Sequence, residues 1–180
     1  NLLYEFLCLE LPWDHVDEAG CARPLEWSGR TVGRFMRFFG PISSFFDILT
    51  FAYLFFVLCP EVCGGNFASL AGTPEQMRFI VLFQSGWFLE SMWTQILILH
   101  LLRTQKVPLL QSRPSRPVML VTLLGTLLFT VMTFTSIGRV IGLTALPLSY
   151  FVYLAIVVAL YLLWVTLAKR WYIRRYHELL

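Results

Sequence analysis

Three side chains in this sequence carry oxygen atoms that could bind a metal ion in apolar surroundings. Asn1 and Glu5 stand four residues apart at the start of the chain, and Glu90 stands in a later apolar run. If the first residues form a helix, Asn1 and Glu5 lie one turn apart on the same face. Amide and carboxylate oxygens are the ligands that Mg²⁺ and Ca²⁺ prefer, whereas softer metals prefer sulfur or imidazole. The pair therefore predicts a hard-cation site, and the alternative is an interfacial carboxylate at the end of a helix.

The depth of Glu5 in a membrane makes this pair informative. As a helix, residues 1–12 rise about 18 Å, roughly half of a hydrocarbon core that is about 30 Å thick. Pro12 would then lie near one interface and Asn1 near the bilayer midplane. An acid inside a membrane is costly unless it faces a partner or a cavity, so it is a candidate functional group. We also expect that the chain begins inside a transmembrane helix of a larger protein.

Glu90 lies near the middle of the apolar run 79–102, at about the same predicted depth as Glu5. Gly86, Glu90 and Thr94 would share one helix face, a pattern typical of helices packed inside a bundle. Glu90 could contribute to the ion site. Equally, it could be a protonated or hydrogen-bonded carboxyl group that joins helices, and the sequence leaves both interpretations open.

Asp47 is the other deep acid, one turn after Ser43 in the apolar run 35–58. Gly40 and Pro41 precede it, and a proline at this position is expected to kink the helix. We favour a structural role for Asp47 over ligation, because an acid beside hydroxyl groups can satisfy backbone groups that a kink frees. The alternative that stays open is that Asp47 supports an ion ligand without touching the ion.

The histidines and cysteines indicate no soft-metal centre. The chain has three histidines without paired spacing, which argues against zinc or copper. His100, beside the end of an apolar run, is expected to act as an anchor or a hydrogen-bonding group. Cys59 and Cys63 could pair on an oxidising face or remain free thiols, and the short segment between them slightly favours free thiols.

The composition predicts an all-α, polytopic transmembrane helical bundle. The 180 residues are 57% hydrophobic, and the mean hydropathy of +0.67 excludes an ordinary soluble domain. We predict one half-helix followed by four spanning helices that form a single membrane domain. Their ranges are 1–12, 35–58, 79–102, 118–135 and 146–167.

The basic residues predict the orientation of this bundle. Twelve of the 14 lysines and arginines fall on one side of the predicted topology, and only Arg78 and Arg139 fall on the other. The richer side is cytoplasmic by the positive-inside rule. A net charge of +3, clustered between apolar runs, favours contact with membrane lipids, including anionic headgroups, and indicates no nucleic-acid partner. The twelve are Arg23, Arg30, Arg34, Arg37, Arg103, Lys106, Arg113, Arg116, Lys169, Arg170, Arg174 and Arg175.

Several stretches resemble a known family. Asn-Leu-Leu-Tyr-Glu at residues 1–5, followed by Leu-Pro-Trp-Asp at residues 11–14, resembles the sixth transmembrane helix of P-type cation ATPases. Further stretches make the chain similar to the bacterial magnesium-translocating branch of that family. They are Gly33–Met36, Phe39–Phe51, Phe83–Phe88, Thr94–Gln95, His100, Arg103–Pro108, Gln111–Arg113 and Leu146–Phe151.

The resemblance implies that residues 1–180 are the C-terminal transmembrane domain of such a pump, from the end of the sixth helix through the tenth. Asn1 and Glu5 would be ligands of a transported Mg²⁺ ion and Glu90 would complete or shape the site, although the family pattern has Asp where this chain has Glu5. The parent protein would hydrolyse ATP, also with Mg²⁺, and carry the ion across the cell (inner) membrane into the cytoplasm. The partners would be the rest of the parent chain and membrane lipids.

Two alternatives remain open at this stage. The 180 residues contain neither an Asp-Lys-Thr-Gly-Thr phosphorylation motif nor a Walker loop, so they cannot hydrolyse ATP alone. The parent could be a calcium pump or another cation pump, which depends on residues of the fourth and fifth helices. The segment could also be a non-catalytic membrane scaffold, in which case Asn1 and Glu5 would tolerate apolar substitution.

Overall fold

The computed structural model describes residues 5, 8–9, 11–14, 29–102, 104 and 114–176. Its elements are all helical, with no strand among the described residues, which confirms the predicted all-α class. They are η1 (Leu11–Trp13), α3 (Gly29–Tyr53), η2 (Leu54–Leu58), α4 (Cys59–Cys63), α5 (Pro74–Leu102), α6 (Arg116–Met132), α7 (Ser136–Val140) and α8 (Leu148–Tyr176).

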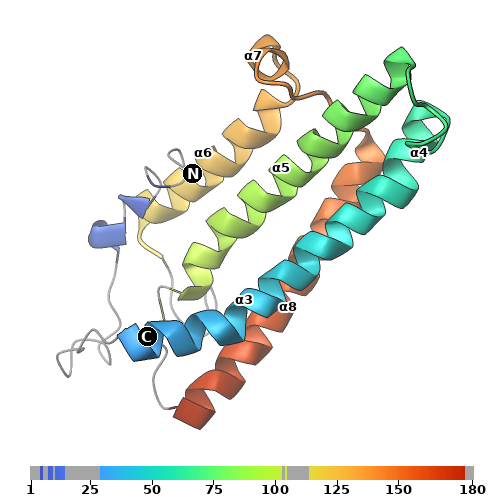
Figure 1. Cartoon of the computed structure of the whole chain (residues 1–180). Helices are drawn as coiled ribbons and strands as arrows, with labels where there is room; N and C mark the ends of the chain where they lie inside the picture. Colours follow the sequence, from blue (N-terminus) through green and yellow to red (C-terminus); the bar gives the residue numbers. More distant parts are fainter. Residues whose placement is uncertain are drawn as a thin grey trace.

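The long helices are arranged around α5. It packs against α3 and α8 on one side and against α6 on the other, and α3 also packs along α8 (Figure 1). The start of α3 and the ends of α5 and α8 lie at one end of the bundle. There the Arg34 guanidinium lies over the ring of Tyr176, and the Lys169 ammonium bonds the carbonyl of Leu101. Figure 1 shows α4 and α7 at the opposite end.

Two helical segments are long and apolar enough to cross a membrane, judged by length and composition. They are Gly29–Cys63, in which α3, η2 and α4 form one continuous helix, and α8. Helix α6 is apolar but has only 17 residues, and α5 is long enough at 29 residues but carries Glu90, Gln84 and Gln95. The structure thus supports two of the four predicted spans, and the other two remain predictions.

The helices extend differently from the apolar runs that predicted them. The run 35–58 lies inside a helix that starts at Gly29 and continues to Cys63, and the run 146–167 lies in a helix that continues to Tyr176. Hydrophobicity locates the part of a helix that can enter lipid, whereas backbone hydrogen bonding continues into the polar flanks. Figure 1 also shows α3, which contains Pro41, bending after its first turns.

A π-helical turn, η2, interrupts the first long helix. The N–H of Cys59 bonds to the carbonyl of Leu54, five residues earlier, and Pro60 follows directly. A proline has no N–H for the regular i→i−4 bond, so a wider turn just before it redistributes the backbone bonds. The helix ends at Gly64, whose φ of 76° is the left-handed conformation that terminates many helices.

Gly86 allows α5 to approach its neighbours closely. A Cβ atom at this position would lie 2.6 Å from Cδ2 of Leu54 and 3.3 Å from Cε2 of Tyr150. Leu54 and Tyr150 are themselves fully buried, so neither side chain can move aside freely. The packing of α5 against η2 and α8 therefore depends on the absence of a side chain at Gly86.

We predict that Gly86→Ala destabilises the purified protein by about 1–3 kcal/mol, the usual cost of overpacking a core. Gly40→Ala is the matched control, because a Cβ atom there meets nothing within 4 Å. It should be neutral or stabilising by up to ~1 kcal/mol, since alanine favours helix. The measurement is the thermal unfolding midpoint in detergent, and equal midpoints for the two variants would contradict this packing.

Candidate functional site

Glu90 occupies the centre of the bundle. Its side chain has no solvent-exposed surface, and Gly86 and Thr94, one turn before and after it, are buried on the same face of α5. The predicted inward face is therefore confirmed. Neither carboxyl oxygen of Glu90 has a hydrogen-bond partner among the described residues. Because an unpaired buried carboxyl group is costly, this position is expected to hold a proton or to face a cation or water.

A belt of polar side chains from α3 and α8 surrounds this position. The hydroxyl of Tyr150 donates a hydrogen bond to the carbonyl of Gly86, one turn before Glu90. The hydroxyl of Tyr153 donates to Oγ1 of Thr50 at 3.3 Å. Asp47, half-buried on α3, lies within electrostatic range of Glu90. Hydrogen bonds of two tyrosines of α8 thus reach α5 at Gly86 and α3 at Thr50.

Stacked aromatic rings hold this region together. The rings of Tyr53 and Tyr153 are parallel, with centroids 3.7 Å apart, and join α3 to α8 directly beside the Tyr153–Thr50 hydrogen bond. This stacking fixes the position of the Tyr153 hydroxyl between α3 and α8, whereas the Glu90 carboxyl group has no hydrogen-bond partner among the described residues.

Glu5, unlike Glu90, is exposed to solvent. Its carbonyl accepts a hydrogen bond from the N–H of Leu9 at 3.2 Å, which forms one helical turn. Asn1 lies outside the described residues, so the predicted pair remains a prediction. Across the described residues, no group of three or more histidine, cysteine or acidic side chains is positioned to hold a metal ion. The predicted set of Asn1, Glu5 and Glu90 therefore remains a prediction.

The remaining candidates from the sequence, His100, Cys59 and Cys63, take part in helix packing. Nε2 of His100 and Oγ1 of Thr122 share a hydrogen bond at 3.1 Å, which joins α5 to α6, as expected for a hydrogen-bonding histidine. Cys59 and Cys63 are buried free thiols, the alternative that the sequence slightly favoured.

Sequence reasoning missed two polar contacts at the basic end of the bundle. Lys169, counted only as a topological charge, is 2% exposed and donates a hydrogen bond to the carbonyl of Leu101 at 2.6 Å, near the end of α5. Asp14 accepts a hydrogen bond from the N–H of Ser115 at 2.7 Å, directly before α6. A charge at the end of a span or in a loop carries no local signal that distinguishes such a contact from solvent exposure.

Sequence reasoning also missed the tyrosines of α8. Between residues 148 and 162 the sequence has three tyrosines, at intervals of three and eight residues: Tyr150, Tyr153 and Tyr161. That helical spacing within an otherwise aliphatic run was a signal that this face is polar and inward.

Comparisons with known proteins agree with this architecture. The family model described as "Cation transporting ATPase, C-terminus" matches residues 1–171. The chain is 40% identical over 178 residues, 99% of its length, to the "Magnesium-transporting ATPase, P-type 1" of Salmonella typhimurium strain LT2. It is 40% identical over 176 residues, 98% of its length, to the protein of the same name from Escherichia coli K12. In both cases the chain spans 18% of the relative's length.

The unpartnered state of Glu90 leads to a prediction about stability. Replacing it by leucine removes a buried carboxyl group that makes no hydrogen bond with the described residues, so Glu90→Leu should unfold at the same temperature as the unchanged protein or higher. Thr94→Val is the control, because the hydrogen bonds of Thr94 Oγ1 with the described residues go to backbone carbonyls of its own helix, at 3.0 and 3.1 Å. The measurement is thermal unfolding in detergent without divalent cations, and a large fall for Glu90→Leu alone would show that the carboxyl group is paired.

Proposed function

Because this chain belongs to the family described as "Cation transporting ATPase, C-terminus", we propose that it is the C-terminal transmembrane domain of a P-type ATPase that moves Mg²⁺ into the cytoplasm. The observation that carries the proposal is the 40% identity, along almost the whole chain, to proteins named as magnesium-transporting ATPases. A likeness this long includes the helices and the segments between them.

The ATP-hydrolysing parts of the proposed pump belong to the rest of the parent chain. Since the 180 residues span 18% of the relatives, ATP binding, phosphorylation and the coupling of both to transport belong to the segments upstream. Those segments are the main partner of this domain, and Mg²⁺ serves there also as the companion of ATP. We place the protein in the cell (inner) membrane with several spans, and the end that carries Arg34, Lys169 and Arg174 faces the cytoplasm.

In this proposal Asn1 and Glu5 give oxygen ligands to the ion, and Glu90 shapes the site from α5. Three features support these roles: the one-turn spacing of Asn1 and Glu5, the helical turn at Glu5, and the buried carboxylate of Glu90 without a partner among the described residues. Glu90 would act on the ion site from α5, next to Gly86, whose carbonyl accepts the hydrogen bond of Tyr150.

The ion and the class of protein can be tested separately. An Asp-Lys-Thr-Gly-Thr segment in the sequence upstream of Asn1 would establish the pump class, and its absence would favour a scaffold. Uptake of Ca²⁺ in place of Mg²⁺ by the full-length protein in vesicles would favour another cation pump.

We predict that Glu5→Gln in the full-length protein lowers Mg²⁺ uptake at least tenfold, because an uncharged amide oxygen binds a divalent cation more weakly than a carboxylate does. The measurement is Mg²⁺ uptake by membrane vesicles at matched protein amounts. Glu75→Gln is the control, since Glu75 is half-exposed at the start of α5, 3.5 Å from Arg78.

Both variants should insert and accumulate normally, so a loss of uptake would be a loss of function and not of folding. Near-normal Mg²⁺ uptake by Glu5→Gln would overturn the role of Glu5 as a ligand.

A further inference from the structure

The short helix α7, between α6 and α8, has an apolar side and a polar side. Ile137, Val140 and Ile141 fall within an arc of about 100° around the helix axis and are 69%, 85% and 58% exposed. Arg139 lies on the other side, and its guanidinium donates a hydrogen bond to Oγ of Ser136 at 3.0 Å. The segment is therefore amphipathic, and the described residues do not cover its apolar side.

Contacts at Gly138 fix the rotation of α7. Gly138 is buried against the end of α6, where a Cβ atom would collide with the carbonyl oxygen of Met132. Its N–H donates to Oγ1 of Thr135 at 3.3 Å, and its carbonyl accepts from the N–H of Leu143 at 2.8 Å. Because these contacts hold α7 in one orientation, its apolar side stays outside the bundle.

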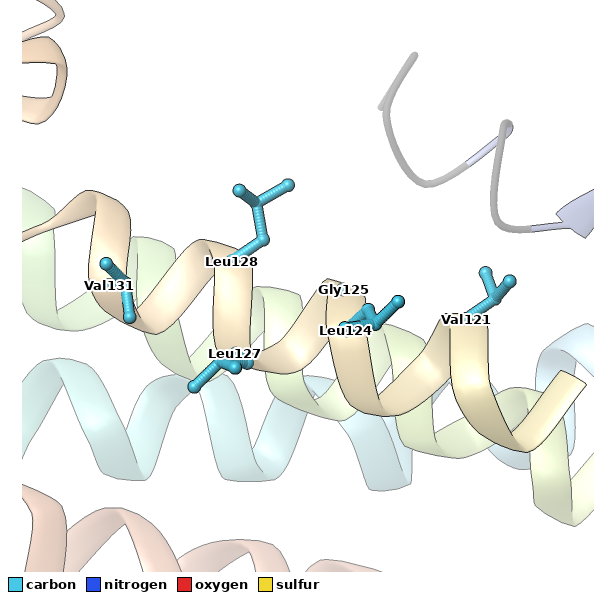
Figure 2. Close-up of a pocket in the computed structure, with 6 residues that line it drawn as sticks. All are labelled: Val121, Leu124, Gly125, Leu127, Leu128 and Val131. Carbon is cyan, nitrogen blue, oxygen red and sulfur yellow. The ribbon is translucent and has the colours of Figure 1, made fainter. Parts of the chain in front are cut away.

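The outward side of α6 leads along the chain to α7. Figure 2 shows Leu124, Leu127, Leu128 and Val131 beside an apolar groove of about 520 Å³ on this helix, and all four side chains are exposed. Apolar exposure continues beyond α7, because Leu148 at the start of α8 is 81% exposed. Exposed apolar surface of this extent marks a contact with a membrane or with a partner protein.

The length of α6 places α7 at the outer edge of the proposed membrane. Arg116 begins α6 at the basic end, and its 17 residues rise about 26 Å, which is shorter than a hydrocarbon core of about 30 Å. An upright α6 therefore ends about 4 Å inside the far boundary, and a tilted one ends deeper. Helix α7 starts four residues after Met132, so it lies where hydrocarbon gives way to lipid headgroups.

The side chains of α7 favour lipid over another helix as the neighbour. Close helix contacts in membranes use small residues, and the glycine of α7 is already packed against α6. The uncovered side presents branched aliphatic groups, which suit acyl chains. Arg139 on the other side has the charge that phosphate groups of a membrane interface attract, and its long side chain can extend toward them.

We propose that α7 is an interfacial helix that inserts Ile137, Val140 and Ile141 among the acyl chains of the outer leaflet and keeps Arg139 at the headgroups. This surface recognises the apolar part of a phospholipid and requires no particular headgroup. The inserted helix completes the crossing that α6 is too short to make and holds the connection to α8 at a fixed depth. The proposal rests on the proposed membrane location and not on the transported ion.

The test is the environment of single nitroxide labels on the full-length protein in phospholipid vesicles, with the native cysteines replaced by alanine. The labels are placed at Ile137→Cys or Val140→Cys on the apolar side, and at Arg139→Cys on the polar side as the matched control. Collisions of each label with oxygen, which concentrates in lipid, and with a water-soluble nickel chelate are measured by power saturation of the spectrum.

We expect the ratio of oxygen to nickel collisions at Ile137→Cys and Val140→Cys to be at least about threefold higher than at Arg139→Cys, because apolar side chains of an interfacial helix lie below the headgroups. The two apolar positions carry the same expectation, so one of them suffices if the other variant does not accumulate.

A ratio at both apolar positions as low as that at Arg139→Cys would overturn the proposal, since both sides of α7 would then face water. Few collisions with either reagent at the apolar positions would also overturn it, because protein would then cover them. Mg²⁺ uptake is measured on the unlabelled full-length protein. Absence of uptake together with lipid-exposed labels would refute the transport function and leave this contact standing.

Discussion

A carboxyl group in the middle of an apolar bundle is the constraint on which the interior of this domain depends. Glu90 is completely buried on α5, and its oxygens have no hydrogen-bond partner in the described part of the chain. The helix that carries it is held against its neighbours by the close contact at Gly86, one turn earlier, where Leu54 and Tyr150 leave no room for a side chain. This packing fixes the position of Glu90 without giving its carboxyl group a hydrogen-bond partner among the described residues. A buried carboxyl group that is fixed in position but lacks hydrogen bonds is suited to interact with a cation.

The neighbours of Glu90 explain why it need not be a direct ligand. Asp47, Thr50, Tyr150 and Tyr153 form a polar region between α3, α5 and α8, and the π-helical turn η2 lies directly after Tyr53 in the same helix as Asp47. Wide turns of this kind are frequent at functional sites because they can change register at low cost.

Much of the fold could be predicted from the sequence, because membrane insertion leaves a strong signal. The all-α class followed from composition, and the inward face Gly86–Glu90–Thr94 followed from helical spacing. The sequence could not locate the end of each helix, since helices such as α8 continue as far as Tyr176 through charged residues that do not enter lipid. Hydropathy alone also does not count the spans, because Glu90 and the two glutamines of α5 lower the mean hydropathy of that helix.

The candidate site was only partly accessible to the same reasoning. Spacing identified Glu5 and Glu90 separately, but whether residues on distant helices meet depends on tertiary packing. The described residues put Glu90 with Asp47 and leave Glu5 exposed beside the segment that contacts α6. Lys169 and Asp14 were missed for a related reason. Each bonds a backbone group at a helix end more than 60 residues away, a contact that no local pattern encodes.

The most direct measurement is the position of the bound ion. Mn²⁺ can replace Mg²⁺ in the full-length protein, with a nitroxide label placed either at Leu9→Cys, one turn from Glu5, or at Val140→Cys at the far end of the bundle; both positions are exposed. We predict that Mn²⁺ bound in competition with Mg²⁺ broadens the spectrum of the label at residue 9 but not at residue 140, and that Glu5→Gln abolishes the broadening. Equal broadening at both labels, or broadening that persists in Glu5→Gln, would contradict the account.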